Sequence, residues 1–291
     1  MKIARSIASL RSTLALWRKD EARIALVPTM GALHEGHLAL LRRAKAECGR
    51  TVVSIFVNPK QFAPHEDFSA YPRGEEADLE KLEREGADLA FLPPLDEIYP
   101  EGFATSVRVA GLSEPLCGAH RPGHFDGVAT VVTKLLTQSL PDAAYFGEKD
   151  YQQLLIVRRL ARDLDLGAEI VAVPTVREKD GFALSSRNAY LTAQERQRAP
   201  ELYRVLCLIA GALEKEPGAV ARELALGLAD LNAAGFAVEY LEVRDASTLV
   251  PATSKVASPS RVFVAARLGG TRLIDNIAIP APSALASISP R

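Results

Sequence analysis

Two histidines three residues apart follow an apolar segment near the N-terminus. His34 and His37 lie in the glycine-containing stretch Val27–Leu38, directly after the apolar residues 24–27. Helical spacing begins at once, at Leu38, Leu41, Ala44 and Cys48. This pattern predicts that the histidines occupy the turn between a buried parallel strand and a helix N-terminus. Because such a terminus has unpaired N–H groups and the positive end of the helix dipole, it is suited to phosphate.

Other uses of a histidine pair fit the sequence less well. A single histidine near a helix start is more often structural than catalytic, whereas two on one side of a turn can both donate to phosphate oxygens. A zinc site would need further ligands at suitable spacing, and the sequence offers none. The glycine patterns of a P-loop and of a dinucleotide fingerprint are missing, which disfavours a P-loop NTPase and weakens a dehydrogenase interpretation.

Two further clusters follow later in the chain. Asn58–Phe62 ends a β-branched segment, and its amides can bind a substrate with hydroxyl and carboxylate groups; an ordinary turn closed by Pro59 is an equal alternative. Arg121–Gly127 precedes an apolar helical segment and could serve an anion or a lid. A capping loop with Asp126 as the N-cap explains it equally well.

The remaining two clusters carry phosphate-binding residue types. In Phe146–Gln153, Gly147 permits close backbone approach, Lys149 can neutralise phosphate, and Asp150 could hold a ribose hydroxyl or help hold magnesium. A solvated helix start is the simpler alternative. Asp180–Asn188 supplies two hydroxyls and a guanidinium, which suit a triphosphate and a loop that closes over it. Its place between two predicted domains strengthens an otherwise weak motif.

The elements that must position these clusters alternate along the first 176 residues. Strands are predicted at 23–27, 51–57, 87–92, 105–109, 142–146 and 168–173, and helices at 6–18, 36–48, 74–85, 127–139 and 150–163. Gly49 is expected to be a helix C-cap. This alternation predicts a Rossmann-like parallel sheet with helices on both faces, in which strand ends and ligand sites share one edge.

The pattern changes after residue 176. A capping box formed by Thr192 and Glu195 predicts a helix through about 213, and a second helix is expected at 218–233. Alternating segments then predict strands at 236–243, 261–268 and 273–279. We therefore expect two domains, 1–176 for nucleotide and substrate binding and 177–291 as a smaller α+β lid with antiparallel strands, with a cleft between them.

Composition narrows the function classes. The 291 residues include 35 basic and 36 acidic side chains, a net charge of −1 that argues against nucleic acid as the main partner. The cysteines Cys48, Cys117 and Cys207 are scattered and lack metal-ligand spacing, which favours a reducing compartment. Because neither a signal-peptide core nor a membrane span is visible, we expect a soluble cytoplasmic protein.

Several motifs together resemble a known family. The His-x-Gly-His turn and a later Ser-Ser-Arg loop look like the nucleotidyltransferase superfamily that includes class I aminoacyl-tRNA synthetases. The match is closer to the pantothenate synthetases (pantoate–β-alanine ligases), because order and spacing agree over segments 28–37, 56–62, 146–153 and 180–188. Leu184 replaces the family's methionine, a change that conserves volume.

The resemblance implies a two-step ligation. ATP and (R)-pantoate would form pantoyl adenylate and pyrophosphate, and the β-alanine amine would then attack to release AMP and pantothenate, the vitamin B5 precursor of coenzyme A. Magnesium would be carried with ATP, with no tightly bound cofactor and no metal held by the protein itself. Family members are usually homodimers through the N-terminal domain.

The resemblance also implies roles for individual residues. His34, His37, Lys149 and Arg187 would be catalytic, with His37 as proton donor. Gln61 and Gln153 would hold pantoate, with Gln61 also near β-alanine, and Asn58 would support the magnesium–phosphate end or the water network. Val176 would lie on the adenine. The expected ATP-binding residues are Met30, Gly31, Ala32, Leu33, His34, Glu35, Gly36, His37, Gly147, Glu148, Lys149, Asp150, Val176, Leu184, Ser185, Ser186 and Arg187.

Two other functions stay open from the sequence. A superfamily relative that only transfers a nucleotide to a phosphorylated substrate would share the histidine turn. It would not need the paired amides at Gln61 and Gln153. A non-catalytic nucleotide-binding module would keep ATP affinity and show no turnover.

Overall fold

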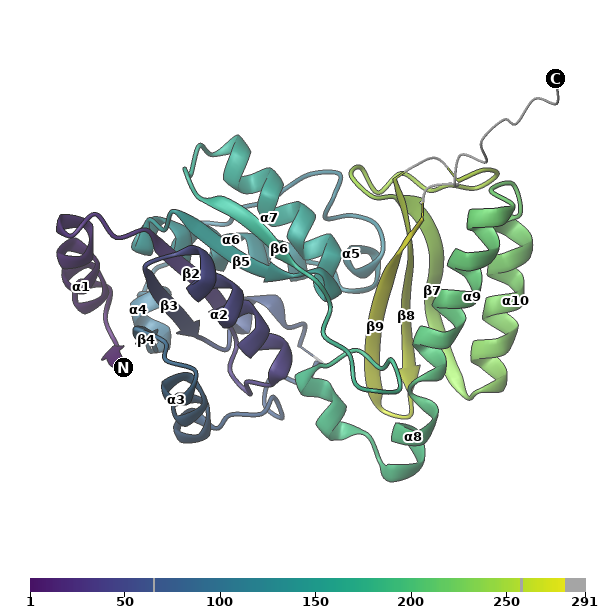
Figure 1. Ribbon diagram of the computed structural model, residues 1–291, viewed down its shortest axis with the longest axis horizontal. Coiled ribbons are helices and arrows are strands. Elements are labelled where there is room, and N and C mark those ends of the chain that lie inside the picture. Colours follow the sequence, from purple (N-terminus) through teal and green to yellow (C-terminus); the bar gives the residue numbers. More distant parts are fainter. Residues whose placement is uncertain (65, 257–258, 281–291) are drawn as a thin grey trace, which may run out of the picture. The chain divides into compact units, whose positions relative to one another are not determined.

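The computed structural model describes residues 1–64, 66–256 and 259–280 (Figure 1). It divides into two compact units, the first formed by Met1–Val176 and Leu184–Ser186 and the second by Arg177–Ala183 and the chain from Arg187 onward. The short segment Leu184–Ser186 thus belongs to the first unit although it follows residue 176. Residues 281–291 of the expected second domain lie outside the described residues.

The first unit contains a six-stranded sheet in the order β1-β4-β3-β2-β5-β6, and every neighbouring pair is parallel. The strands are β1 (Lys2–Ala4), β2 (Ile24–Thr29), β3 (Arg50–Ile55), β4 (Leu89–Phe91), β5 (Ala143–Gly147) and β6 (Glu169–Val173). The predicted Rossmann-like parallel sheet is confirmed. Because β2 lies between β3 and β5, the strand order reverses there, which is where such sheets bind ligands.

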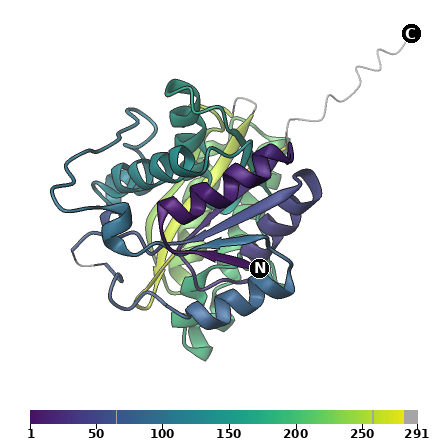
Figure 2. The same cartoon turned by 90° about the vertical axis from the view of Figure 1, so that its left-hand side faces the viewer.

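Helices cover both faces of this sheet (Figure 2). On the face of α2 and α3, apolar side chains of β2 and β3 pack with Leu40, Leu41 and Leu82. On the other face lie α1, α6 and α7. The helices of this unit are α1 (Ile7–Lys19), α2 (Glu35–Glu47), α3 (Glu75–Arg84), α4 (Leu95–Ile98), α5 (Cys117–His120), α6 (His124–Ser139) and α7 (Tyr151–Asp163), with 3-10 turns η1 (Pro59–Gln61) and η2 (Glu148–Asp150).

Some local predictions for the first unit are wrong. Residues 105–109 form no strand, because the Val107 N–H donates to the Thr130 hydroxyl (2.9 Å) instead of to a neighbouring strand. Gly49 is not the C-cap, since α2 ends at Glu47 and its C-cap is Cys48, which has an extended backbone. The three-residue strand β1 was not predicted, because it is too short to show a hydrophobic period.

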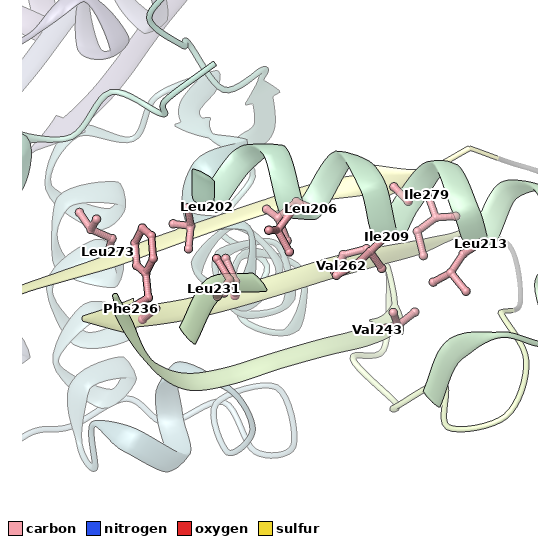
Figure 3. Close-up of a cluster of buried hydrophobic side chains, with 14 of the residues drawn as sticks. Leu202, Leu206, Ile209, Leu213, Leu231, Phe236, Val243, Val262, Leu273 and Ile279 are labelled. Atoms are coloured by element: carbon pink, nitrogen blue, oxygen red, sulfur yellow. The ribbon is translucent and has the colours of Figure 1, made fainter. Parts of the chain in front are cut away.

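The second unit is a three-stranded antiparallel sheet packed against helices. Its strands are β7 (Phe236–Asp245), β8 (Ser260–Leu268) and β9 (Thr271–Ile279), which pair in chain order. Both pairs are antiparallel, as predicted. Helices α9 (Glu201–Lys215) and α10 (Val220–Ala233) pack on the sheet, and Leu206, Ile209 and Val262 meet in the core (Figure 3).

The start of the second unit differs from the prediction in one respect. The capping box of Thr192 and Glu195 is confirmed, but the helix that it opens, α8, covers only Ala193–Arg198. Pro200 has no N–H to continue the ladder, so α9 begins afresh at Glu201. The 3-10 turn η3 (Ser186–Tyr190) precedes α8. No helix among the described residues combines the length and apolar character needed to cross a bilayer.

Candidate active site

The turn between β2 and α2 has an unusual backbone. Gly31 and Ala32 both have positive φ angles, 82° and 49°, so the chain reverses sharply after the strand. A Cβ at Gly31 would lie 3.1 Å from Asp78 Oδ2 and 3.2 Å from Ile55 Cγ2. Glycine is therefore favoured at this position both by its backbone conformation and by the tight space around it.

His34 and His37 form a reciprocal cap at the N-terminus of α2. His34 Nδ1 accepts a hydrogen bond from the Gly36 N–H (3.1 Å), and His37 Nδ1 accepts one from the His34 N–H (3.3 Å). The ring centroids are 4.1 Å apart. Because both Nδ1 atoms are acceptors, each neutral ring carries its proton on Nε2. The pair therefore presents two Nε2–H donors.

Both imidazoles are neutral at pH 7. Burial lowers the pKa of His34 to about 4, and the positive charge of Lys149 contributes in the same direction. Burial, followed by repulsion from His34, lowers the pKa of His37 to about 3. The pair therefore offers hydrogen-bond donors without carrying a charge of its own.

Lys149 lies at the carboxyl end of β5. The strand ends at Gly147, and η2 carries Lys149 and Asp150, whose Nζ and Oδ1 atoms are 3.6 Å apart. A Cβ at Gly147 would meet none of the described residues within 4 Å, so the space above this glycine is open to a ligand. Because β2 and β5 are paired neighbours in the sheet, the histidine turn and the Phe146–Gln153 cluster follow adjacent strands, and the charge of Lys149 acts on His34.

The amides of the second cluster are linked to the histidine turn. The buried Asn58 donates from Nδ2 to Gln61 Oε1 (3.0 Å) and to the Gly127 carbonyl (3.1 Å). Asn58 Oδ1 accepts from the Tyr99 hydroxyl (2.8 Å), so its amide is fully engaged within the protein. Gln61 Nε2 lies 2.9 Å from Met30 Sδ, in the first cluster. Asn58 thus orients Gln61, and the Gln61 NH2 group points to the turn.

The Arg121–Gly127 cluster supports the backbone of Gln61. Arg121 forms a two-point ion pair with Glu66, at 2.6 Å in both contacts, and also donates to the Gln61 carbonyl (3.2 Å). His124 donates from Nδ1 to the same carbonyl (2.8 Å). Gly123, with a φ of 79°, is the N-cap of α6, so the prediction that Asp126 caps this helix is wrong.

The fifth cluster is divided between the units. Within the first unit, the Leu184 N–H donates to the Val176 carbonyl (3.0 Å), and Ser186 Oγ donates to the Ala32 carbonyl (3.3 Å). Ser185 and Ser186 belong to this unit, whereas Arg187 belongs to the second. The structure thus joins Ser186 to the turn that precedes His34. Gln153 is half-buried in the first turn of α7.

A hairpin before these serines is anchored in the second unit. Arg177 makes a bidentate ion pair with the buried Asp275 (2.6 and 2.9 Å) and lies 3.8 Å from the ring centroid of Tyr203. It also donates to the Gly181 carbonyl (3.1 Å). These contacts fix the chain that leads into Leu184.

Sequence reasoning missed several residues that hold the site. Asp78 accepts the N–H groups of Ala32 and Leu33, Tyr99 binds Asn58, and Glu66 binds Arg121. Asp78 lies in an acidic helix where nothing in the sequence separates it from solvated neighbours. In the described part of the chain, no three His, Cys, Asp or Glu side chains group as metal ligands do.

A parallel sheet with a His-x-Gly-His turn at its reversal point defines a Rossmann-like α/β protein of the nucleotide-binding kind. The family model described as pantoate-beta-alanine ligase matches residues 2–278, and the chain belongs to this family. The pantothenate synthetase of Paramagnetospirillum magneticum is 56% identical over 279 residues, covering 95% of this chain and 97% of the relative.

Solved structures from the same family are also similar to this chain. The pantothenate synthetase of Thermus thermophilus matches with a TM-score of 0.90 and 48% identity, over 96% of this chain and 99% of that one. The pantoate-beta-alanine ligase of Francisella tularensis, described as complexed with beta-gamma ATP and beta-alanine, matches with a TM-score of 0.80 and 34% identity, over 97% and 100%. The family resemblance expected from the sequence is confirmed.

Proposed function

We propose that this chain condenses (R)-pantoate with β-alanine, using ATP, to give pantothenate, AMP and pyrophosphate through pantoyl adenylate. The observation that carries the proposal is the neutral His34–His37 pair, whose two Nε2–H donors lie at the N-terminus of α2. The chain that leads into this helix includes Met30, which Gln61 contacts. The ligase family and the ATP and β-alanine named for the Francisella relative support it.

In the first step, a carboxylate oxygen of pantoate attacks the α-phosphorus of ATP, and pyrophosphate leaves. This reaction needs positioning and neutralisation of charge, and it needs no nucleophile from the protein. His34 and His37 donate to the phosphoryl oxygens as negative charge develops, and the ammonium of Lys149 adds a full positive charge. Magnesium would enter with ATP as part of the substrate and would supply positive charge to the leaving pyrophosphate.

In the second step, the β-alanine amine attacks the acyl carbon of pantoyl adenylate, and AMP leaves. Asn58 orients the amide of Gln61, whose NH2 group points to Met30. This NH2 group would donate a hydrogen bond to a substrate oxygen. We assign pantoate to Gln61 and Gln153, with β-alanine near Gln61.

The remaining assignments complete the proposal. Ser185, Ser186 and Arg187 bind the phosphates, while Gly147, Asp150 and Val176 line the nucleoside site. The Ala32 and Leu33 N–H groups are already bound to Asp78, so these two residues contact ATP through other atoms. We assign most of the catalytic groups to residues 1–176 and a lid role to 177–291, from which Arg187 supplies a further catalytic group. A homodimer in the cytoplasm fits this biosynthetic chemistry.

Isotope exchange tests this function. Purified protein should exchange pyrophosphate into ATP only when pantoate is present, and should form AMP only when pantoate and β-alanine are both present. Exchange without pantoate would favour nucleotide transfer to another substrate. ATP binding without exchange or AMP formation would favour a non-catalytic module.

A further inference from the structure

The turn that leads into His34 is held by a carboxylate from a different helix. Asp78, in the first turn of α3, accepts the N–H groups of Ala32 (2.8 Å) and Leu33 (2.7 Å), one on each carboxylate oxygen. These are charge-assisted bonds, which are shorter and stronger than bonds between neutral groups. Because His34 follows Leu33 directly, Asp78 fixes the backbone from which the histidine cap begins.

Because the Asp78 carboxylate is buried, the loss of its two hydrogen bonds to the turn would cost free energy. The Asp78 side chain is 3% exposed, and a carboxylate removed from water must be compensated by donors or by an opposite charge. The two N–H groups and Lys81, at 3.9 Å, supply that compensation. The left-handed conformations of Gly31 and Ala32 accompany the convergence of neighbouring N–H groups on one anion.

The carbonyl groups of the same turn are also bound. Lys81 donates from Nζ to the Leu33 carbonyl (2.7 Å), and Ser186 Oγ donates to the Ala32 carbonyl (3.3 Å). One face of α3 thus holds both an N–H pair and a carbonyl of the turn. The orientation of this turn decides where Ser186 and His34 stand relative to each other.

We propose that Asp78 is a positioning residue for adenylate formation, which acts from α3 by fixing the Gly31–Leu33 turn and thereby aiming the Nε2–H groups of His34 and His37. This inference rests on the proposed function. Asp78 touches no reacting atom in this scheme, since both of its oxygens are occupied by the turn.

The test is Asp78→Asn, with Glu80→Gln as the matched control. Both changes remove one negative charge from α3, but the Glu80 side chain is exposed and pairs with Arg84 of the same helix (2.9 Å). An amide at position 78 presents an NH2 group to one of two N–H donors, so the turn loosens. We expect kcat for pantoate-dependent exchange to fall roughly 10-fold or more in Asp78→Asn, and to stay at the wild-type value in Glu80→Gln.

Histidine NMR titration separates positioning from a purely structural role. In the wild-type protein, the His34 and His37 signals should stay in the neutral Nε2–H form down to pH 5, because their pKa values are about 4 and about 3. Removing a nearby negative charge would by itself lower their pKa values further. A rise of these pKa values towards 6.5 in a folded Asp78→Asn protein therefore reports a loosened cap.

Lys81→Met provides a second variant, because it removes the bond to the Leu33 carbonyl and leaves Asp78 in place. We expect a smaller fall in kcat there, and this variant decides the question if Asp78→Asn does not fold. Wild-type kcat in both folded variants, together with wild-type histidine titrations in a folded Asp78→Asn protein, would overturn the proposal. If wild-type protein shows no exchange, the proposed function fails, while the titrations still report whether Asp78 sets the histidine cap.

Discussion

Gly127 allows the turn Pro59–Gln61, which we propose binds pantoate through Gln61, to pack directly on α6, so Gly127→Ala should damage the use of pantoate. A Cβ at this position would lie 2.2 Å from the Lys60 carbonyl oxygen and 2.7 Å from the Gln61 nitrogen. Real Cβ contacts do not fall below 3.0 Å, so the turn must move by at least about 0.8 Å. All of the contacting atoms are backbone, and no side-chain rotation can relieve them.

The displacement acts on the proposed pantoate site more than on the proposed ATP site. Moving Gln61 disturbs its bonds with Asn58 and Met30, while the histidine cap keeps its own hydrogen bonds. Because a shift of about 1 Å in a positioning group can cost as much as 10²-fold in rate, we expect kcat/KM for pantoate to fall roughly 10- to 10²-fold. KM for ATP should change little.

Steady-state kinetics with varied pantoate and varied ATP measure this effect, and urea denaturation measures stability. Overpacking should cost about 1–3 kcal/mol, partly offset by about 1 kcal/mol because alanine favours a helix more than glycine. Gly211→Ala in α9 is the matched control, since its Cβ would meet none of the described residues within 4 Å, and it should raise stability. An unchanged kcat/KM for pantoate in Gly127→Ala would refute this reasoning.

Three further outcomes are expected. His37→Ala removes a donor to the phosphoryl group and should lower kcat by roughly 10²-fold or more, whereas full pantothenate formation would contradict its role; His120→Ala is the exposed control. Asp275→Ala leaves the Arg177 charge uncompensated and should lower the free energy of unfolding by about 3–5 kcal/mol, measured in urea, and an unchanged midpoint would refute this. The free energy of unfolding should fall from pH 6.5 towards pH 3. In this range His34 and His37 bind protons in the unfolded chain, whereas in the folded protein their pKa values are about 4 and about 3. Between pH 7 and pH 5, urea denaturation should show a smaller fall in the free energy of unfolding for the double variant His34→Gln/His37→Gln than for the wild-type protein. Equal falls would argue against the lowered histidine pKa values.

The sequence by itself determined the alternation of elements and the place of the main motifs. Apolar runs of four to six residues and helical spacing after Gly36 reflect which faces must be buried, and burial depends on local periodicity. The histidine turn and Lys149 could be placed at neighbouring strand ends, because parallel strands direct their carboxyl ends to one edge. The antiparallel second sheet also followed from alternation within adjacent segments.

Only the tertiary structure decided which polar groups are available to a ligand. Asn58 carries the same amide as Gln61, yet Tyr99 and Gly127 engage it completely, and those partners lie 41 and 69 positions away in the chain. In the same way, residues 105–109 have the composition of a strand, but no neighbouring strand accepts them among the described residues. Sequence distance carries no information about such pairings.

The protonation state of the histidines also depends on the tertiary structure. The spacing of His34 and His37 showed that they share one side of a turn, but their charge depends on burial and on Lys149, which lies far along the chain. Asp78 looks like any carboxylate of an acidic helix until the fold places it under the Ala32 and Leu33 N–H groups. Local pattern determines where a residue sits on its element, whereas desolvation and long-range contacts determine what its side chain can do.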